Sequence, residues 1–236
     1  EQAASWVLTA AGLGSVHARV HRLGYPGMLS DFEPLFSNAH LSTLAGNFWK
    51  RAIDESRFPT HEVIYQTEPG TSVLVHANRP SGAVRGEALL VHGLEGSSRS
   101  GYMMSLAQAL CENGFAAHRL NMRGCGGSER LTSTLYHSGL TADALAVLSH
   151  LRDKSDAPLF LAGFSLGGNL TLKLAGELGS SAAPLVSGFI AVSTPIDLSE
   201  CVCRIDAREN FLYQQRFVIS LRNRYRRRHL AEPDRF

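Results

Sequence analysis

The segment GFSLGG, Gly163–Gly168, is the clearest candidate for chemistry because it holds Ser165 in a G-x-S-x-G pattern. The apolar run at 158–164 predicts a strand before the serine, and 167–179 predicts a helix after it. A sharp strand-to-helix turn exposes the serine hydroxyl, and small flanking glycines let the two elements approach closely. The sequence therefore predicts Ser165 as a catalytic nucleophile; an ordinary glycine-rich turn is the alternative.

A second segment, VHGLEGSS at 91–98, ends an apolar strand predicted over 87–92. In hydrolases with such a serine turn, one oxyanion-hole N–H comes from this loop and the other from the residue after the nucleophile. The predicted donors are the backbone amides of Leu94 and Leu166. His92 could be a general base, but its place in a His-Gly turn favours a structural role. A phosphate loop is the other alternative, although the segment lacks the P-loop lysine and spacing.

The third segment, NMRGCGGSER at 121–130, has glycines that allow a tight loop beside the mouth of the site. Its Cys125 could be a nucleophile, but no base adjoins it in the sequence. The chain has four cysteines without a C-x-x-C pair, so neither a disulfide framework nor a zinc ribbon is indicated. We expect small buried thiols in the reducing cytoplasm, with no cofactor and no metal.

Alternating strands and helices must position these three segments. A helix is predicted within 30–51, and mainly helical structure over 197–231. An antiparallel hairpin is expected from the runs 61–65 and 72–78. Four buried strands at 87–92, 115–121, 158–164 and 185–193 alternate with helices at 102–114, 140–153 and 167–179. This pattern predicts an α/β fold with a mostly parallel sheet and helices on both faces.

Three regions are expected: an N-terminal helical segment at 1–60, the α/β core at 61–195 and a helical lid at 196–236. The helix predicted over 211–231 places Val218, Leu221 and Tyr225 on one face. The segment could be a lid that admits acyl chains, with arginines that contact anionic lipid surfaces. A solvated basic face is the alternative.

The bulk composition describes a folded globular chain. Its 236 residues are 44% hydrophobic and 19% charged, which excludes a disordered polymer. A net charge of +2 is too small to imply a nucleic-acid partner. No stretch approaches the roughly 20 apolar residues of a membrane span, and the N-terminal sequence does not resemble a signal peptide. The expected partner is a small ester or lipid, with peripheral membrane contact possible and the oligomeric state open.

Several spaced motifs resemble the YheT-like branch of the α/β-hydrolase fold, which includes bacterial esterases and eukaryotic membrane-associated lipid hydrolases. The matching segments are FEPLFSNAHLST (32–43), VHGLEGSSRSGY (91–102), NMRGCGGS (121–128), YHSG (136–139), GFSLGGN (163–169) and AVSTPIDL (191–198). The resemblance implies hydrolysis of carboxylic esters, with Ser165 as the nucleophile and the oxyanion loop around Leu94. The hairpin TEPGTSVLV departs from the family's acidic Asp-Gly-Asp turn.

The remaining catalytic residues are not evident in the sequence. In this fold the order is Ser, then Asp or Glu, then His, and the resemblance implies that both follow later strands. We therefore expect a C-terminally incomplete sequence, with the last strands, the acid and the histidine beyond Phe236, and weak activity of this piece alone. Asp197 could be the acid or a helix cap. His229 could be the base or part of a solvated helix face.

The sequence thus predicts a serine hydrolase that cleaves short-chain acyl esters, acylglycerols or phospholipids through an acyl-enzyme. One alternative is a non-catalytic binding protein of the same fold without a complete triad. Another keeps the fold and transfers the acyl group to an alcohol instead of water.

Overall fold

The computed structural model describes residues 7–8, 20–21, 41, 45, 51–231 and 233. The chain divides into two compact units, residues 1–50 and 51–236. In the first unit, β1 (Val7–Leu8) and β2 (Val20–His21) pair antiparallel. The helix predicted within 30–51 lies outside the described residues except for Leu41 and Ala45, which are helical.

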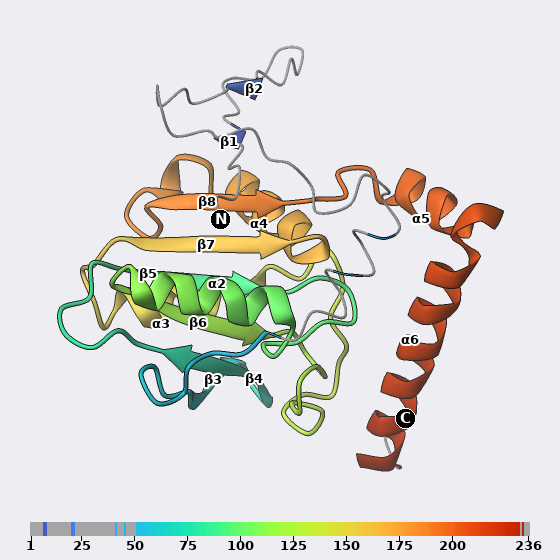
Figure 1. The fold of residues 1–236 in the computed structure, drawn as a ribbon, viewed down its shortest axis with the longest axis horizontal. Helices are drawn as coiled ribbons and strands as arrows, with labels where there is room; N and C mark the ends of the chain where they lie inside the picture. Colours follow the sequence, from blue (N-terminus) through green and yellow to red (C-terminus); the bar gives the residue numbers. More distant parts are fainter. Residues whose placement is uncertain are drawn as a thin grey trace. The chain divides into compact units, whose positions relative to one another are not determined.

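The second unit is built on a six-stranded sheet with the order β3-β4-β6-β5-β7-β8 (Figure 1). The first two strands form the predicted hairpin, and β4 also pairs antiparallel with β6. All other pairs are parallel, as the alternation of strands and helices predicted. The strands are β3 (His61–Glu68), β4 (Thr71–Asn78), β5 (Gly86–Val91), β6 (Phe115–Asn121), β7 (Leu159–Phe164) and β8 (Gly188–Val192).

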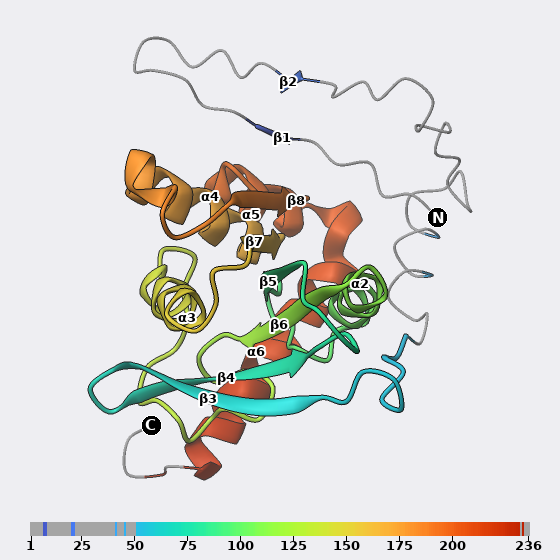
Figure 2. The same ribbon diagram turned by 90° about the vertical axis from the view of Figure 1, so that its left-hand side faces the viewer.

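Helices cover both faces of this sheet (Figure 2). On one face lies α2 (Gly101–Glu112), and on the other lie α3 (Ala142–Arg152) and α4 (Leu166–Leu178). Strand β5 shows why two layers are needed, since its side chains alternate between two cores. Leu89 and Val91 join the core under α3 and α4, while Ala88 and Leu90 join the core under α2.

Residues 198–231, which follow β8, are mainly helical, as predicted. They form α5 (Leu198–Asp206), the short 3₁₀ helix η2 (Arg208–Asn210) and α6 (Phe211–Ala231). Figure 1 shows α6 beyond the carboxyl ends of the parallel strands, where their arrowheads point. None of the helices in the described part of the chain has the length and apolar character to cross a membrane.

Candidate active site

Ser165 lies at the sharp turn between β7 and α4, in a backbone conformation that few residues adopt. Its φ is 52° and its ψ is −118°, a region that costs a non-glycine residue about 1–3 kcal/mol. The surrounding structure holds this turn, because the Ser165 N–H donates to the Val192 carbonyl at 2.9 Å. The side chain is exposed, and no hydrogen bond joins its hydroxyl to any described residue.

The glycines around Ser165 are required by close backbone approach. A Cβ added to Gly163 would lie 2.0 Å from the Gly167 carbonyl oxygen. One added to Gly167 would lie 2.4 Å from the Val91 carbonyl oxygen. Real Cβ atoms do not approach backbone atoms this closely, so β5, β7 and α4 can meet only where side chains are absent. The predicted close packing of strand and helix is confirmed.

The loop at 92–98 lies directly beside Ser165. A Cβ added to Gly93 would be 3.0 Å from the Ser165 Cβ. From Gly93 to Ser98 each backbone amide except that of Leu94 donates a hydrogen bond. The acceptors for residues 93, 95, 96, 97 and 98 are, in order, Tyr102 Oη, Tyr136 Oη, Gly93 O, Ser100 Oγ and Asn121 Oδ1. Within the described part of the chain, the Leu94 amide alone in this run has no acceptor.

The second predicted donor, the Leu166 amide, belongs to the first residue of α4. The first N–H groups of an α-helix have no acceptor inside the helix, and the helix dipole places partial positive charge there. The loop after β5 and the start of α4 therefore both adjoin Ser165, the first through Gly93 and the second through the next residue in the chain, Leu166.

His92 is a structural residue here, as its place in the His-Gly turn predicted. Its ring is fully buried, with Nδ1 2.7 Å from its neighbour's carbonyl, Gly93 O, and Nε2 accepting from the Met122 N–H at 3.2 Å. Burial lowers the pKa of His92 to about 4, so the ring is neutral at pH 7. Both nitrogens are engaged, which leaves neither available to take a proton from Ser165.

The neutral His92 ring predicts a loss of stability in mild acid. Between pH 6.5 and 4 the unfolded chain binds a proton that the folded chain excludes. Stability contributed by the neutral ring is therefore constant above pH 6.5 and falls with pH below it, by about 3 kcal/mol at pH 4. Urea unfolding of the wild type and His92→Gln from pH 7 to 4 should show a smaller loss in the variant. If the free energy of unfolding fell equally with pH in both proteins, the buried ring would not be neutral.

The glycine-rich loop lies beside the 92–98 loop, and both line one cavity. Gly126 and Gly127 have positive φ values of 63° and 97° and line a cavity of about 290 Å³ together with Glu95 and Arg224. Cys125 is buried in this loop, and burial raises the pKa of its thiol to about 12. Such a thiol is protonated at pH 7, which agrees with the interpretation that it is not a nucleophile.

The two candidate triad residues do not reach Ser165 with a hydrogen bond. The Asp197 carboxylate accepts the Glu200 N–H at 2.9 Å and caps α5, which confirms the helix-cap alternative. His229 is exposed near the end of α6. No histidine of residues 51–231 hydrogen-bonds to the Ser165 hydroxyl.

Two arginines of α6 are buried, which the interpretation of 211–231 as a solvated basic face did not predict, although Arg222, Arg226 and Arg227 are exposed. Arg224 is 3% and Arg228 1% exposed. Arg224 Nη2 lies 2.7 Å from Glu95 Oε1, and Arg228 donates to the carbonyls of Thr132 and Thr134. Sequence reasoning missed these contacts because the partners are more than 90 residues away. The one available signal was the spacing of four between Ser220, Arg224 and Arg228.

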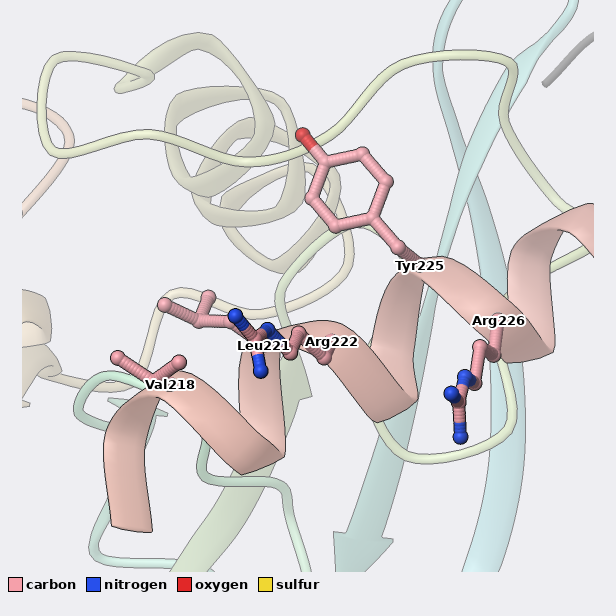
Figure 3. Close-up of a pocket in the computed structure, with 5 residues that line it drawn as sticks. All are labelled: Val218, Leu221, Arg222, Tyr225 and Arg226. Atoms are coloured by element: carbon pink, nitrogen blue, oxygen red, sulfur yellow. The ribbon is translucent and has the colours of Figure 1, made fainter. Parts of the chain in front are cut away.

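The predicted helix with Val218, Leu221 and Tyr225 on one face is confirmed. Val218, Leu221 and Tyr225 project from one side of the helix (Figure 3). They line an open groove of about 450 Å³ with Arg222 and Arg226. Tyr225 remains 55% exposed.

The sequence of the chain agrees with this architecture. Residues 89–229 match the family model described as alpha/beta hydrolase fold. The chain belongs to the α/β-hydrolase fold family. The solved structure of the esterase Pf2001 of Pyrococcus furiosus matches with a TM-score of 0.52 at 19% identity, over 64% of this chain and 59% of the esterase chain. At that identity the likeness concerns the fold alone.

Curated relatives narrow the resemblance within the α/β-hydrolases. "Putative esterase YheT" of Escherichia coli (strain K12) is 32% identical over 197 residues, which are 81% of this chain and 56% of that protein. "Phospholipase ABHD3" of Mus musculus is 34% identical over 106 residues, 44% of this chain and 26% of its own. The predicted YheT-like α/β-hydrolase is confirmed. The chain spans little more than half the length of the E. coli relative and about a quarter of the mouse one.

Proposed function

We propose that this protein is a serine hydrolase that cleaves carboxylic esters through an acyl-enzyme on Ser165. One observation supports this above the others. The exposed hydroxyl of a serine in a strained turn adjoins the 93–98 loop, in which only the Leu94 amide lacks an acceptor among the described residues. A free N–H beside a nucleophile is the arrangement needed to stabilise negative charge on a substrate oxygen.

In the proposed reaction, Ser165 Oγ attacks the ester carbonyl carbon and gives its proton to a general base. The carbonyl oxygen becomes an oxyanion that accepts hydrogen bonds from the amides of Leu94 and Leu166. Collapse of this intermediate breaks the ester C–O bond, and the base returns the proton to the departing alcohol. Water then repeats the sequence on the acyl-enzyme and releases the acid. In this proposal the base and its acid lie outside residues 51–231.

The proposed substrates are short-chain acyl esters or the acyl esters of lipids. The phospholipase name of the mouse relative supports the lipid class. The groove along α6 supports it too, because Val218, Leu221 and Tyr225 offer apolar surface to an acyl chain. Exposed Phe211 and Leu212, at the start of α6, would suit peripheral contact with a lipid surface. Residues 196–236 would then form the lid of the site.

A second candidate function is a binding protein of the same fold that does not catalyse. The observation in its favour is that the described part of the chain brings no histidine to the Ser165 hydroxyl. Without a base, a serine hydroxyl is a weak nucleophile.

Covalent labelling of the native-length gene product separates these candidates. Ser165 Oγ should displace fluoride from a fluorophosphonate probe, and intact-mass and peptide analysis should show one adduct per chain, on Ser165. Urea-unfolded protein is the control, since unfolding removes the turn. A folded protein that gains no adduct, or gains it elsewhere, would exclude Ser165 as an activated nucleophile and favour the binding protein.

A further inference from the structure

The residue after Leu94 buries a carboxylate beside the candidate site. The side chain of Glu95 is 6% exposed. Its Oε1 lies 2.7 Å from Arg224 Nη2, and its Oε2 accepts the Ser220 hydroxyl at 2.8 Å. Both partners belong to α6, so this carboxylate joins the loop after β5 to a helix that begins 116 residues later in the chain.

Arg224 is equally enclosed. Its guanidinium carbon lies 4.6 Å from the centre of the Tyr136 ring, a cation–π distance, and its side chain is 4% exposed. Two charges removed from water are tolerated when they are paired, and removing one leaves the other uncompensated. The Glu95–Arg224 pair therefore fixes both elements at one contact.

The backbone of Glu95 explains why this loop needs fixing. The Gly96 N–H donates to the Gly93 carbonyl at 3.0 Å, which closes a four-residue turn. Glu95 is the third residue of this turn and has a φ of 58°. A positive φ at the third residue, with a negative one at the second, defines a type II turn, where glycine is the usual residue. Glutamate is strained at this position.

The strained residue is held at both its backbone and its side chain. The Tyr136 hydroxyl accepts the Glu95 N–H at 3.1 Å and donates to the Glu95 carboxylate at 3.3 Å. This turn also fixes the direction of the Leu94 N–H. The Gly93 carbonyl lies 2.7 Å from His92 Nδ1 and accepts the Gly96 N–H, so the trans peptide points the Leu94 N–H the opposite way.

We infer that Glu95 and Arg224 are positioning residues that hold the Leu94 amide in place for the oxyanion and make its geometry depend on the docking of α6. This inference rests on the proposed ester hydrolase function. A glycine would adopt the turn without strain, whereas a glutamate there has a conformational cost, which the contacts of its carboxylate offset. The docking of α6 thereby controls the position of one of the two proposed oxyanion donors.

The test compares kinetics of native-length variants with a p-nitrophenyl ester. Arg224→Met should lower kcat by about 10²-fold, as misplacement of a catalytic donor does, with KM within about twofold. Affinity for a trifluoromethyl ketone, which forms a tetrahedral oxyanion adduct, should weaken by a similar factor. Arg224→Lys should retain part of the rate. Arg227→Met is the matched control on the same helix, because Arg227 is 55% exposed, and it should leave kcat unchanged.

A double variant distinguishes positioning from a general loss of structure. Glu95→Gly combined with Arg224→Met removes both charges and relieves the turn, so kcat should recover to within about fivefold of the wild type. Should Arg224→Met fail to fold, Tyr136→Phe provides the same comparison, with an expected loss of about tenfold in kcat and none in KM. Higher KM with unchanged kcat and inhibitor affinity would overturn the inference. A wild type without Ser165-dependent turnover would instead overturn the proposed function.

Discussion

Replacement of Ser165 by alanine is expected to lower kcat for ester hydrolysis by roughly 10⁶, the loss seen when a serine hydrolase is deprived of its nucleophile. Residual acceleration from the proposed oxyanion donors and substrate binding should remain at about 10³–10⁴ over water. The change should leave the fold intact, since the side chain is exposed and its hydroxyl has no hydrogen-bond partner among the described residues. Turnover of a p-nitrophenyl ester and a urea unfolding curve measure the two effects.

A serine at the other end of the same helix provides the matched control. Ser180 is exposed in the 3₁₀ turn η1 (Gly179–Ala182) that follows α4. Ser180→Ala should therefore leave both kcat and the unfolding midpoint unchanged. If Ser165→Ala kept more than about a tenth of the wild-type kcat, the acyl-enzyme mechanism on this residue would be untenable.

The order of elements could be predicted from the sequence because each element has its own local pattern. Four apolar runs predicted β5 to β8, and the glycines at 163 and 167 predicted the close approach that the turn needs. Helix α6 was predicted with its observed bounds, Phe211–Ala231. Hydrophobic period and glycine placement are properties of neighbouring residues, so one sequence contains them.

The buried charges could not be predicted in the same way. Glu95 and Arg224 meet although 129 positions separate them in the chain. A pattern can assign an arginine to a helix face, but whether that face meets water or a carboxylate depends on tertiary docking. The strain at Glu95 was hidden for a related reason. A glutamate in the sequence gives no local signal of a positive φ. The contacts of its side chain, which only the structure gives, explain how the turn is maintained.

The strand-to-helix turn also makes a prediction about stability. Gly163→Ala should destabilise the protein by about 4 kcal/mol or more, beyond the 1–3 kcal/mol usual for an overpacked core. The added methyl group would lie 2.0 Å from the Gly167 carbonyl oxygen and 2.4 Å from Thr171 Oγ1. The first of these atoms is backbone at the start of α4, so relief requires β7 and the helix to separate. Urea unfolding followed by circular dichroism measures the change.

Gly176→Ala makes the same chemical change later in α4, ten residues after Leu166. Gly176 lies in α4, and a Cβ there would meet no atom within 4 Å. Alanine in an exposed helix interior should stabilise the protein by about 0.5–1 kcal/mol relative to glycine. We therefore expect the two substitutions to change the free energy of unfolding in opposite directions. A Gly163→Ala protein as stable as the wild type would mean that strand and helix are not in the close contact on which the exposure of Ser165 depends.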